Sequence, residues 1–258
     1  MKQRIERTIN RLVEKLNKWD AVDTITLAPS AEIDYLDPYF FISLDVFYKK
    51  ELPSVEERRN TFPEGLAFES SCFQTKDRFM VEDIPVRIEY KSIEKIDDML
   101  RNLNSICDVN TQNDTYLFYR IDNNSVLSSK SDWLTEVQRR IHELPERFWE
   151  SLVQNLLATM DHYRSDLGAA VVRGDNYFSL VASAGFIKSA CAVLFAINKE
   201  FQPSPRVIYE RVLELNKLPQ DFRGRFDSFL RNDVAISSER RAEIGELMAK
   251  SIIKMVYV

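Results

Sequence analysis

Apolar residues recur every three or four positions at the start of the chain and through its second half. The spacing of Ile5, Ile9 and Leu12 predicts a helix over residues 2–18. From Ser131 to the end of the chain the same helical period continues, which predicts an all-α second half. The later helices predicted there are Asn176–Lys199, Arg206–Leu215, Gln220–Leu230 and Ser238–Met255.

Runs rich in β-branched and aromatic residues predict strands in the first half of the chain. The predicted strands are Val22–Ala28, Tyr39–Tyr48, Leu66–Phe73, Phe79–Met80, Ile84–Tyr90 and Tyr116–Ile121. A helix from Ser92 to Leu103 is expected after them, because Ser92 can cap its first turn. We therefore expect an α+β protein, with a mixed β-sheet and helices in a domain of residues 1–128 and an all-α helical bundle in residues 129–258.

Composition and charge narrow the function. At 45% hydrophobic and 29% charged residues, the chain is that of an ordinary globular protein. Its 6 glycines cannot form a glycine-rich loop of the P-loop or dinucleotide-binding type. The formal net charge is −5, whereas nucleic-acid binding requires a basic surface. We expect no nucleic-acid partner.

Cysteine and histidine offer little chemistry. Cys72, Cys107 and Cys191 form no CxxC pair, so we expect free, buried thiols and no thiolate metal site. His142 and His162 are expected on helix surfaces. No uninterrupted apolar segment has the length of a membrane span, and the amphipathic first helix does not resemble a signal peptide. These features predict a cytoplasmic protein without a membrane partner.

Two carboxylates interrupt otherwise apolar strands. Asp45 lies within the run from Phe40 to Phe47, and Glu89 lies beside Ile88. An ionised carboxylate in such surroundings is costly unless it is paired or bound to a metal. If two adjacent strands project Asp45 and Glu89 from one sheet face, a shared cation would explain both. The alternatives are that Asp45 pairs with Arg87 and Glu89 with a nearby lysine, or that both lie on a solvated face.

The motifs around these carboxylates resemble the nucleotidyltransferase fold of the polymerase-beta superfamily, and most closely the aminoglycoside nucleotidyltransferases and their uncharacterised bacterial relatives. The motifs are Leu27-Ala28-Pro29-Ser30, Ile42-Ser43-Leu44-Asp45-Val46 and Ile88-Glu89-Tyr90. The resemblance implies that Asp45 and Glu89 are catalytic and hold Mg²⁺, while Ser30 and Ser43 lie at the phosphates. It further implies transfer of a nucleoside monophosphate from a Mg²⁺-bound nucleotide to the hydroxyl of a small molecule.

The resemblance extends into the helical half. Arg173-Gly174-Asp175 and Lys188 look like parts of the helical domain that closes over the active site, and imply phosphate contacts from Arg173 and Lys188. The alternatives are a helix end with a glycine cap at residue 174 and a lysine at the rim of an apolar helix. The sequence leaves the oligomeric state open, and a homodimer is one of the partners we consider.

Two positions depart from the family motif. Pro29 stands where the family has glycine, and Ser43 stands where it has the first aspartate; Asp34 or Asp37 could substitute for the latter. Three hypotheses stay open. The chain transfers nucleotides, or it is a catalytically degenerate relative that binds a nucleotide or metabolite in the interdomain cleft, or it is a structural partner protein without a ligand.

Overall fold

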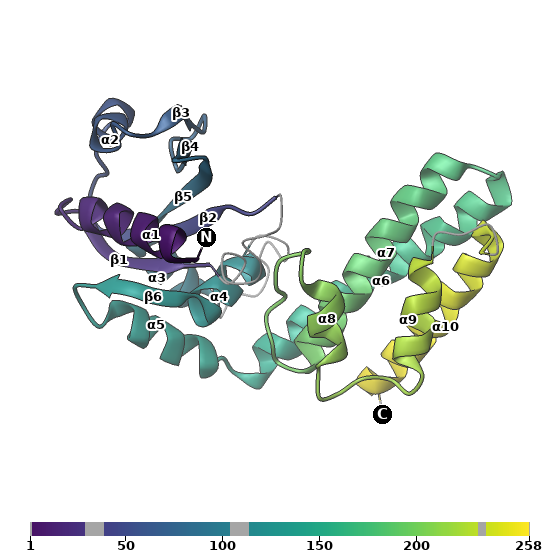
Figure 1. Cartoon of the computed structure of the whole chain (residues 1–258). Helices are drawn as coiled ribbons and strands as arrows, with labels where there is room; N and C mark the ends of the chain where they lie inside the picture. The colour runs from purple at the N-terminus through teal and green to yellow at the C-terminus, as the bar shows by residue number, and fades with distance from the viewer. Residues whose placement is uncertain (1, 29–38, 104–113, 232–235, 258) are drawn as a thin grey trace. The chain divides into compact units, whose positions relative to one another are not determined.

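The computed structural model describes residues 2–28, 39–103, 114–231 and 236–257, which form two compact units (Figure 1). The first unit contains residues 2–28, 39–103 and 120–143 of the described chain, and the second contains residues 114–119, 144–231 and 236–257. A β-sheet dominates the first unit, and the elements described in the second are all helices. The α+β class is therefore confirmed.

The first unit is built on a six-stranded sheet in the order β3-β4-β5-β2-β1-β6. The strands are β1 (Val22–Leu27), β2 (Ile42–Tyr48), β3 (Leu66–Ser70), β4 (Lys76–Val81), β5 (Ile84–Ser92) and β6 (Ser125–Ser129). The helices that accompany them are α1 (Lys2–Leu16), α2 (Val55–Thr61), α3 (Ile93–Asn102), α4 (Asp114–Asn123) and α5 (Trp133–His142). β2 and β5 pair in parallel and the other neighbours pair antiparallel, so the sheet is mixed.

One face of the sheet forms the hydrophobic core with α1. The apolar stripe of α1, including Leu12 and Leu16, packs against Leu44, Val46 and Ile88 of the central strands. These five side chains are at most 1% exposed. Since successive residues of a strand point to opposite faces, this packing directs Ser43, Asp45 and Glu89 to the other face.

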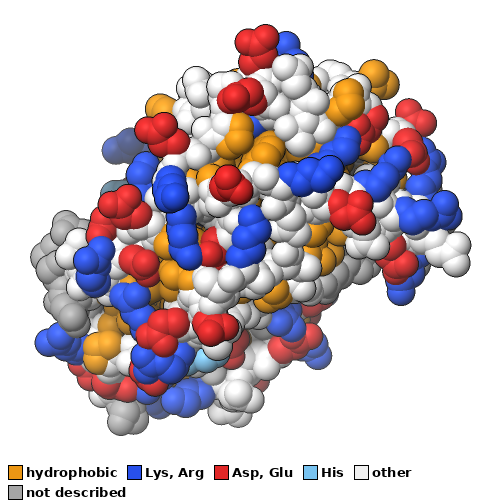
Figure 2. Space-filling view, turned by 90° about the vertical axis from the view of Figure 1, so that its left-hand side faces the viewer, with side chains coloured by type: hydrophobic (Ala, Val, Ile, Leu, Met, Phe, Trp, Pro, Cys, Tyr) orange, Lys and Arg blue, Asp and Glu red, His pale blue; other side chains and the backbone are white. Residues whose placement is uncertain are grey.

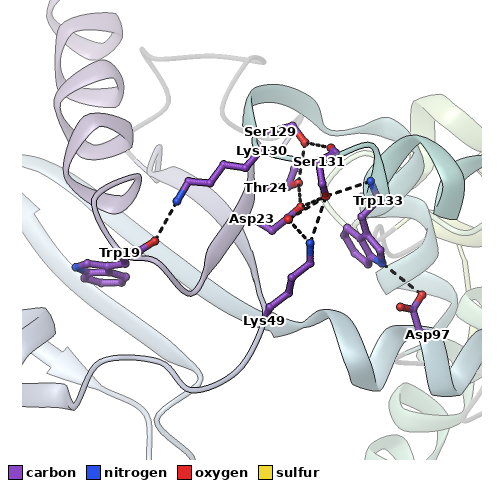
Figure 3. A network of polar contacts seen from close by, with 9 residues as sticks. All are labelled: Trp19, Asp23, Thr24, Lys49, Asp97, Ser129, Lys130, Ser131 and Trp133. Carbon is purple, nitrogen blue, oxygen red and sulfur yellow. Dashed lines mark hydrogen bonds and ion pairs between the residues drawn. The ribbon is translucent and has the colours of Figure 1, made fainter.

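A polar network joins the start of β1 to the residues that follow β2 and precede α5 (Figure 3). Asp23 is 5% exposed and accepts hydrogen bonds from Lys49 Nζ at 2.5 Å and from Ser131 Oγ at 2.8 Å. Thr24 Oγ1 also donates to Asp23 at 3.0 Å. In the same region the indole of Trp133 packs on Phe47. This network joins three segments that are far apart in the sequence.

The second unit consists of helices. They are α6 (Glu146–Arg173), α7 (Asn176–Ile197), α8 (Ile208–Leu213), α9 (Phe222–Leu230) and α10 (Ser238–Tyr257), together with the first residues of α4. α6 and α7 form an antiparallel hairpin, and α10 packs against both (Figure 1). Over the described residues from 131 onward, all elements are helices, as predicted, and the first of them, α5, belongs to the first unit.

Glycines shape the α6–α7 hairpin at two points. Gly174 ends α6 in the left-handed conformation (φ 64°), and Asp175 caps α7 by accepting from Phe178 N at 2.9 Å. The glycine-cap alternative for this segment is thus correct. Near the middle of α7, Gly185 faces Tyr163 of α6, and a β-carbon at 185 would lie 2.7 Å from Tyr163 Cγ. The two helices can approach this closely only because residue 185 has no side chain.

α4 corrects the sequence-based expectation. Tyr116–Ile121 was predicted as a strand but belongs to a helix, whose buried side includes Thr115, Phe118 and Tyr119. Their spacing of three and four residues is helical, but the run is also rich in aromatic residues, which favour strands. α2 and β6 were not predicted.

The thiols and imidazoles follow the predictions with one exception. Cys191 is buried, and burial raises the pKa of its thiol to about 12. Cys72 is exposed, which corrects the expectation of a buried thiol, because it lies in the turn between β3 and β4 and not in a strand of the sheet. Cys107 lies outside the described residues. His142 and His162 are exposed on helices as expected.

α7 also differs from its expected character. Among the described helices it alone is long and apolar enough to cross a membrane by length and composition. The sequence analysis expected no segment of this kind and missed α7, because Lys188 interrupts its apolar run. In the structure 61% of its most apolar stretch is buried inside the protein.

Candidate functional site

Asp45 and Glu89 lie side by side on the polar face of the sheet. They are direct partners in the parallel register of β2 and β5, so both side chains leave the same face. Asp45 is fully buried, whereas Glu89 is 19% exposed in its side chain. The expectation that neighbouring strands bring the two carboxylates together therefore agrees with the strand register.

The guanidinium of Arg120, from α4, contacts both carboxylates. Its Nε lies 2.8 Å from Asp45 Oδ2, and its Nη1 lies 3.2 Å from Glu89 Oε2. Its Nη2 donates to Ser43 Oγ at 3.2 Å. One cation thus touches all three described positions of the motif in β2 and β5.

Two lysines and an amide complete the cluster. Lys91 Nζ donates to Asp45 Oδ1 at 2.6 Å and to Glu89 Oε2 at 3.2 Å. Lys76 Nζ lies 2.9 Å from Glu89 Oε1. Asn124 Nδ2 donates to Asp45 Oδ2 at 3.0 Å and to Thr26 Oγ1 of β1 at 3.0 Å. We call Asp45, Glu89, Lys76, Lys91 and Arg120 the charge cluster.

The charge cluster keeps Glu89 ionised. Burial alone would raise the pKa of this carboxyl, but the nearby charges of Lys91, Arg120 and Lys76 outweigh it and lower the pKa to about 2. Glu89 is therefore an anion at every physiological pH. A general base needs a pKa near the operating pH, so this carboxylate is a weak candidate for proton abstraction.

The donor set does not fit a resident Mg²⁺ ion. A hard cation needs carboxylate oxygens that face it, and both oxygens of Asp45 already accept from Lys91 and Asn124 or pair with Arg120. The cluster carries three cations against two carboxylates, which repels a further cation. Over the described residues, no three acidic, histidine or cysteine side chains gather into a metal site.

Of the two predicted phosphate-binding serines, the structure describes Ser43. Ser30, with Pro29 and the substitutes Asp34 and Asp37, lies outside the described residues. Ser43 is buried, and its hydroxyl accepts from Arg120. Of the paired alternatives, Glu89 does bind nearby lysines, whereas Asp45 pairs with Lys91 and Arg120 and not with Arg87.

Arg173 and Lys188 are not brought together. Arg173 is exposed at the end of α6. Lys188 lines a cavity of about 160 Å³ with Thr159 and Gln202. Thr159 precedes Arg173 by fourteen residues of α6, a helical distance of about 21 Å. Asp175 caps α7.

Four residues of the site were missed: Lys76, Lys91, Arg120 and Asn124. Lys76 lies outside the predicted strand Phe79–Met80. Lys91 could have been found, because alternation along β5 places residues 87, 89 and 91 on one face. Arg120 and Asn124 could not have been found. A strand was predicted over Tyr116–Ile121, and nothing in the sequence indicates that this segment lies beside β2. Of these residues, Lys91 alone had a usable signal in the sequence.

Comparisons with known proteins give three findings. A family model described as a domain of unknown function (DUF4037) matches residues 111–206. A search of curated proteins finds no match. Among solved structures, the chain is similar to a nucleotidyltransferase-like protein from Exiguobacterium sibiricum, at 11% identity and a TM-score of 0.49, over 97% of this chain and 74% of that one.

A second solved structure is an aminoglycoside 6-adenyltransferase from Bacillus subtilis. It is 8% identical, with a TM-score of 0.37, over 96% of this chain and 88% of that one. Both names fall within the group of proteins that the motifs of this sequence resemble. Identities this low identify no substrate, so the chemistry depends on the side chains of this chain.

Proposed function

We propose that this chain is a nucleotidyltransferase-like protein that binds a nucleotide or a related anionic metabolite and does not transfer it. The observation that carries the proposal is the position of Arg120. Its guanidinium contacts Ser43, Asp45 and Glu89, the described residues that would otherwise surround metal and phosphate. A chain with this arrangement does not need Mg²⁺ to neutralise its carboxylates.

The charge around the cluster supports an anionic ligand. Residues that are register partners on β3, β4, β5 and β2 leave the same sheet face. Among the described residues, the cations on this face are Lys76, Arg78, Arg87, Lys91 and, from α4, Arg120, and the carboxylates are Asp45, Glu69 and Glu89. These five cations and three carboxylates of the described chain sum to a charge of +2, whereas the net charge of the whole chain is −5.

The cation-rich face reaches solvent at its outer strands. Arg78 is exposed and forms no ion pair with any part of the chain that the structure describes, and Lys76 is 32% exposed. Next to them, the guanidinium of Arg87 lies 4.2 Å from the ring centroid of Phe41. An exposed arginine beside a stacked one suits a phosphate or carboxylate group of a ligand.

The charge pattern favours a small anion over a nucleic acid. On the face of the molecule seen in Figure 2, basic and acidic side chains alternate and no broad basic area forms. Binding along a nucleic-acid backbone requires many phosphate contacts on one surface. A compact group of cations on a few strands fits a nucleotide-sized ligand.

Thermal unfolding of the whole chain with ATP tests the proposal. At about 10 mM ATP and a Kd of about 100 µM, binding stabilises the folded state by about 2.7 kcal/mol. We expect the melting temperature to rise by several degrees in EDTA and by the same amount in Mg²⁺. Arg78→Ala should weaken ATP binding several-fold, whereas Arg139→Ala, an exposed arginine of α5, should leave it unchanged.

Other outcomes favour the competing functions. Stabilisation that requires Mg²⁺, together with pyrophosphate release that is lost in Asp45→Asn, would show nucleotidyl transfer to a hydroxyl acceptor. No stabilisation by ATP, GTP, CTP or UTP in either buffer would favour a structural protein without a ligand. Either result contradicts the proposal.

A further inference from the structure

An exposed apolar surface lies at the end of the α6–α7 hairpin. Val172 at the end of α6 is 88% exposed, and Tyr177 and Leu180 at the start of α7 are 79% and 66% exposed. Val181 is 44% exposed. We call these four residues the tip patch. Tyr177, Leu180 and Val181 are spaced by three and four residues, so they form one stripe along the helix.

The tip patch is unusual for the helix that carries it. α7 has one charged residue, Lys188, between its first and last positions. Its inner side is buried with Phe186 and Ala190 in the helical unit. A helix that is apolar all round is normally covered all round. Single exposed apolar residues need no explanation, but a stripe of three on one helix, with a fourth at the end of the preceding helix, is typical of an interaction site.

The charges beside the tip patch indicate the partner. Arg173 and Asp175 flank Gly174 in the turn between the helices, and both are exposed. Arg173 forms no ion pair with any described residue, while Asp175 Oδ1 accepts from Phe178 N. One cation and one anion beside an apolar stripe make a surface that is complementary to itself under a two-fold rotation, since residue i of one copy then meets residue j of the other.

We propose that the tip patch joins two copies of this chain into a symmetric dimer. The apolar stripes pack against each other, and Arg173 of each copy pairs with Asp175 of the other. A strongly acidic or basic partner would leave one of these charges opposed by a like charge, which two-fold pairing avoids. A second copy is the occupant that satisfies both the apolar stripe and the two charges.

The size of the patch sets the strength of the dimer. Four partly exposed apolar side chains supply a few hundred Å², about half of the ~800 Å² per partner in a standard interface. Polar residues of the two helix ends must supply the rest. The dimer is therefore weak, with a dissociation constant expected in the micromolar range.

Sedimentation equilibrium of the whole chain over about 1–200 µM tests the dimer. We expect the average mass to rise with concentration toward twice that of the monomer. Leu180→Glu should remain monomeric throughout. The matched control is Leu66→Glu on β3, because Leu66 is 68% exposed and lies outside the tip patch. This control should associate like the unchanged chain.

A charge exchange tests the pairing itself. Arg173→Asp places two acidic residues in the turn and should weaken association at least tenfold. The double variant with Arg173→Asp and Asp175→Arg reverses both charges and should restore it, while thermal unfolding separately reports the loss of the α7 cap. A monomer at 200 µM, equal association of Leu180→Glu, or failure of the double variant to recover would each overturn the proposal.

Discussion

The sheet holds two fully buried aspartates that are paired in different ways. Asp77 of β4 faces the core and binds Arg58 of α2, with Arg58 Nε donating to Asp77 Oδ2 at 2.8 Å and Arg58 Nη2 donating to Oδ1 at 3.2 Å. Tyr90 Oη donates to the same carboxylate at 2.8 Å. Asp45 of β2 faces the other side and belongs to the charge cluster.

The difference between the two is balance. Arg58 is 2% exposed, and its remaining donors bind Pro53 O, Ser70 Oγ and Gln74 O, so the Asp77 pair is closed and neutral. The charge cluster carries more cations than carboxylates and reaches solvent at Lys76. The two aspartates are therefore alike in burial and in ion pairing, and they differ in the excess of cations at an open edge of the sheet, on which the proposed ligand binding depends.

The largest loss of stability is expected when Arg58 is removed from its pair with Asp77. Arg58→Met leaves a buried carboxylate without its cation, which should cost about 3–5 kcal/mol of unfolding free energy. Arg120→Met should cost less, because Lys91 and Asn124 still bind Asp45. Urea unfolding measures both. Equal losses of unfolding free energy would contradict the view that Lys91 and Asn124 compensate for the loss of Arg120.

The control for Arg58→Met is its neighbour. Arg59→Met changes an exposed arginine that lies over the ring of Phe68, and it should cost about 1 kcal/mol or less. A loss as large as that of Arg58→Met would mean that α2 tolerates no change, whatever the burial of the charge.

Acid should affect the charge cluster through Glu89. Because its folded pKa is about 2 and its ordinary value is 4.5, the stabilisation from this carboxylate is complete above pH 4.5 and is lost as the pH falls toward 2. At neutral pH it amounts to at most about 3 kcal/mol. Glu89→Gln should therefore be less stable than the unchanged chain at pH 7, and the gap should narrow at pH 3.

Urea unfolding at the two pH values checks this, with Glu69→Gln as the control. Glu69 is exposed on β3 and forms no ion pair with the described residues, so its variant should follow the unchanged chain at both. A constant gap between Glu89→Gln and the unchanged chain would show that the glutamate acts by packing and not by charge.

The smallest effect is expected at the third buried aspartate. Burial would raise the pKa of Asp23, but its hydrogen bonds with Lys49, Ser131 and Thr24 lower it overall. Lys49 is 49% exposed, so Lys49→Met should cost about 1 kcal/mol and raise the pKa of Asp23. NMR titration of the carboxyl measures the shift, with Lys50→Met as the neighbouring control. No change in that titration would rule out the lysine as a source of the lowered pKa.

The sheet and its carboxylates were largely predictable from the sequence. Alternation along β2 and β5 placed Asp45 and Glu89 opposite an apolar face, and the match of their motifs placed the strands side by side. The helical period after residue 131 likewise predicted helices over the rest of the described chain, the first of which, α5, belongs to the first unit. These features depend on local patterns of two or three to four residues, which a sequence displays directly.

The partners of the carboxylates were not predictable in the same way. Arg120 is 75 residues from Asp45 in the chain, and its helix was predicted as a strand because aromatic residues fill its apolar positions. Only the folded chain shows that a guanidinium fills the centre of the motif. The substitution of serine at position 43 was visible, but the donor that binds it was not.

Gly185 has a consequence for the hairpin as a whole. The ring of Tyr163 occupies the space that a methyl group at position 185 would need. Even alanine at this position would therefore increase the separation between α6 and α7. The position of every side chain along the pair, including those at its exposed end, is thus tied to one hydrogen atom in the place of a side chain.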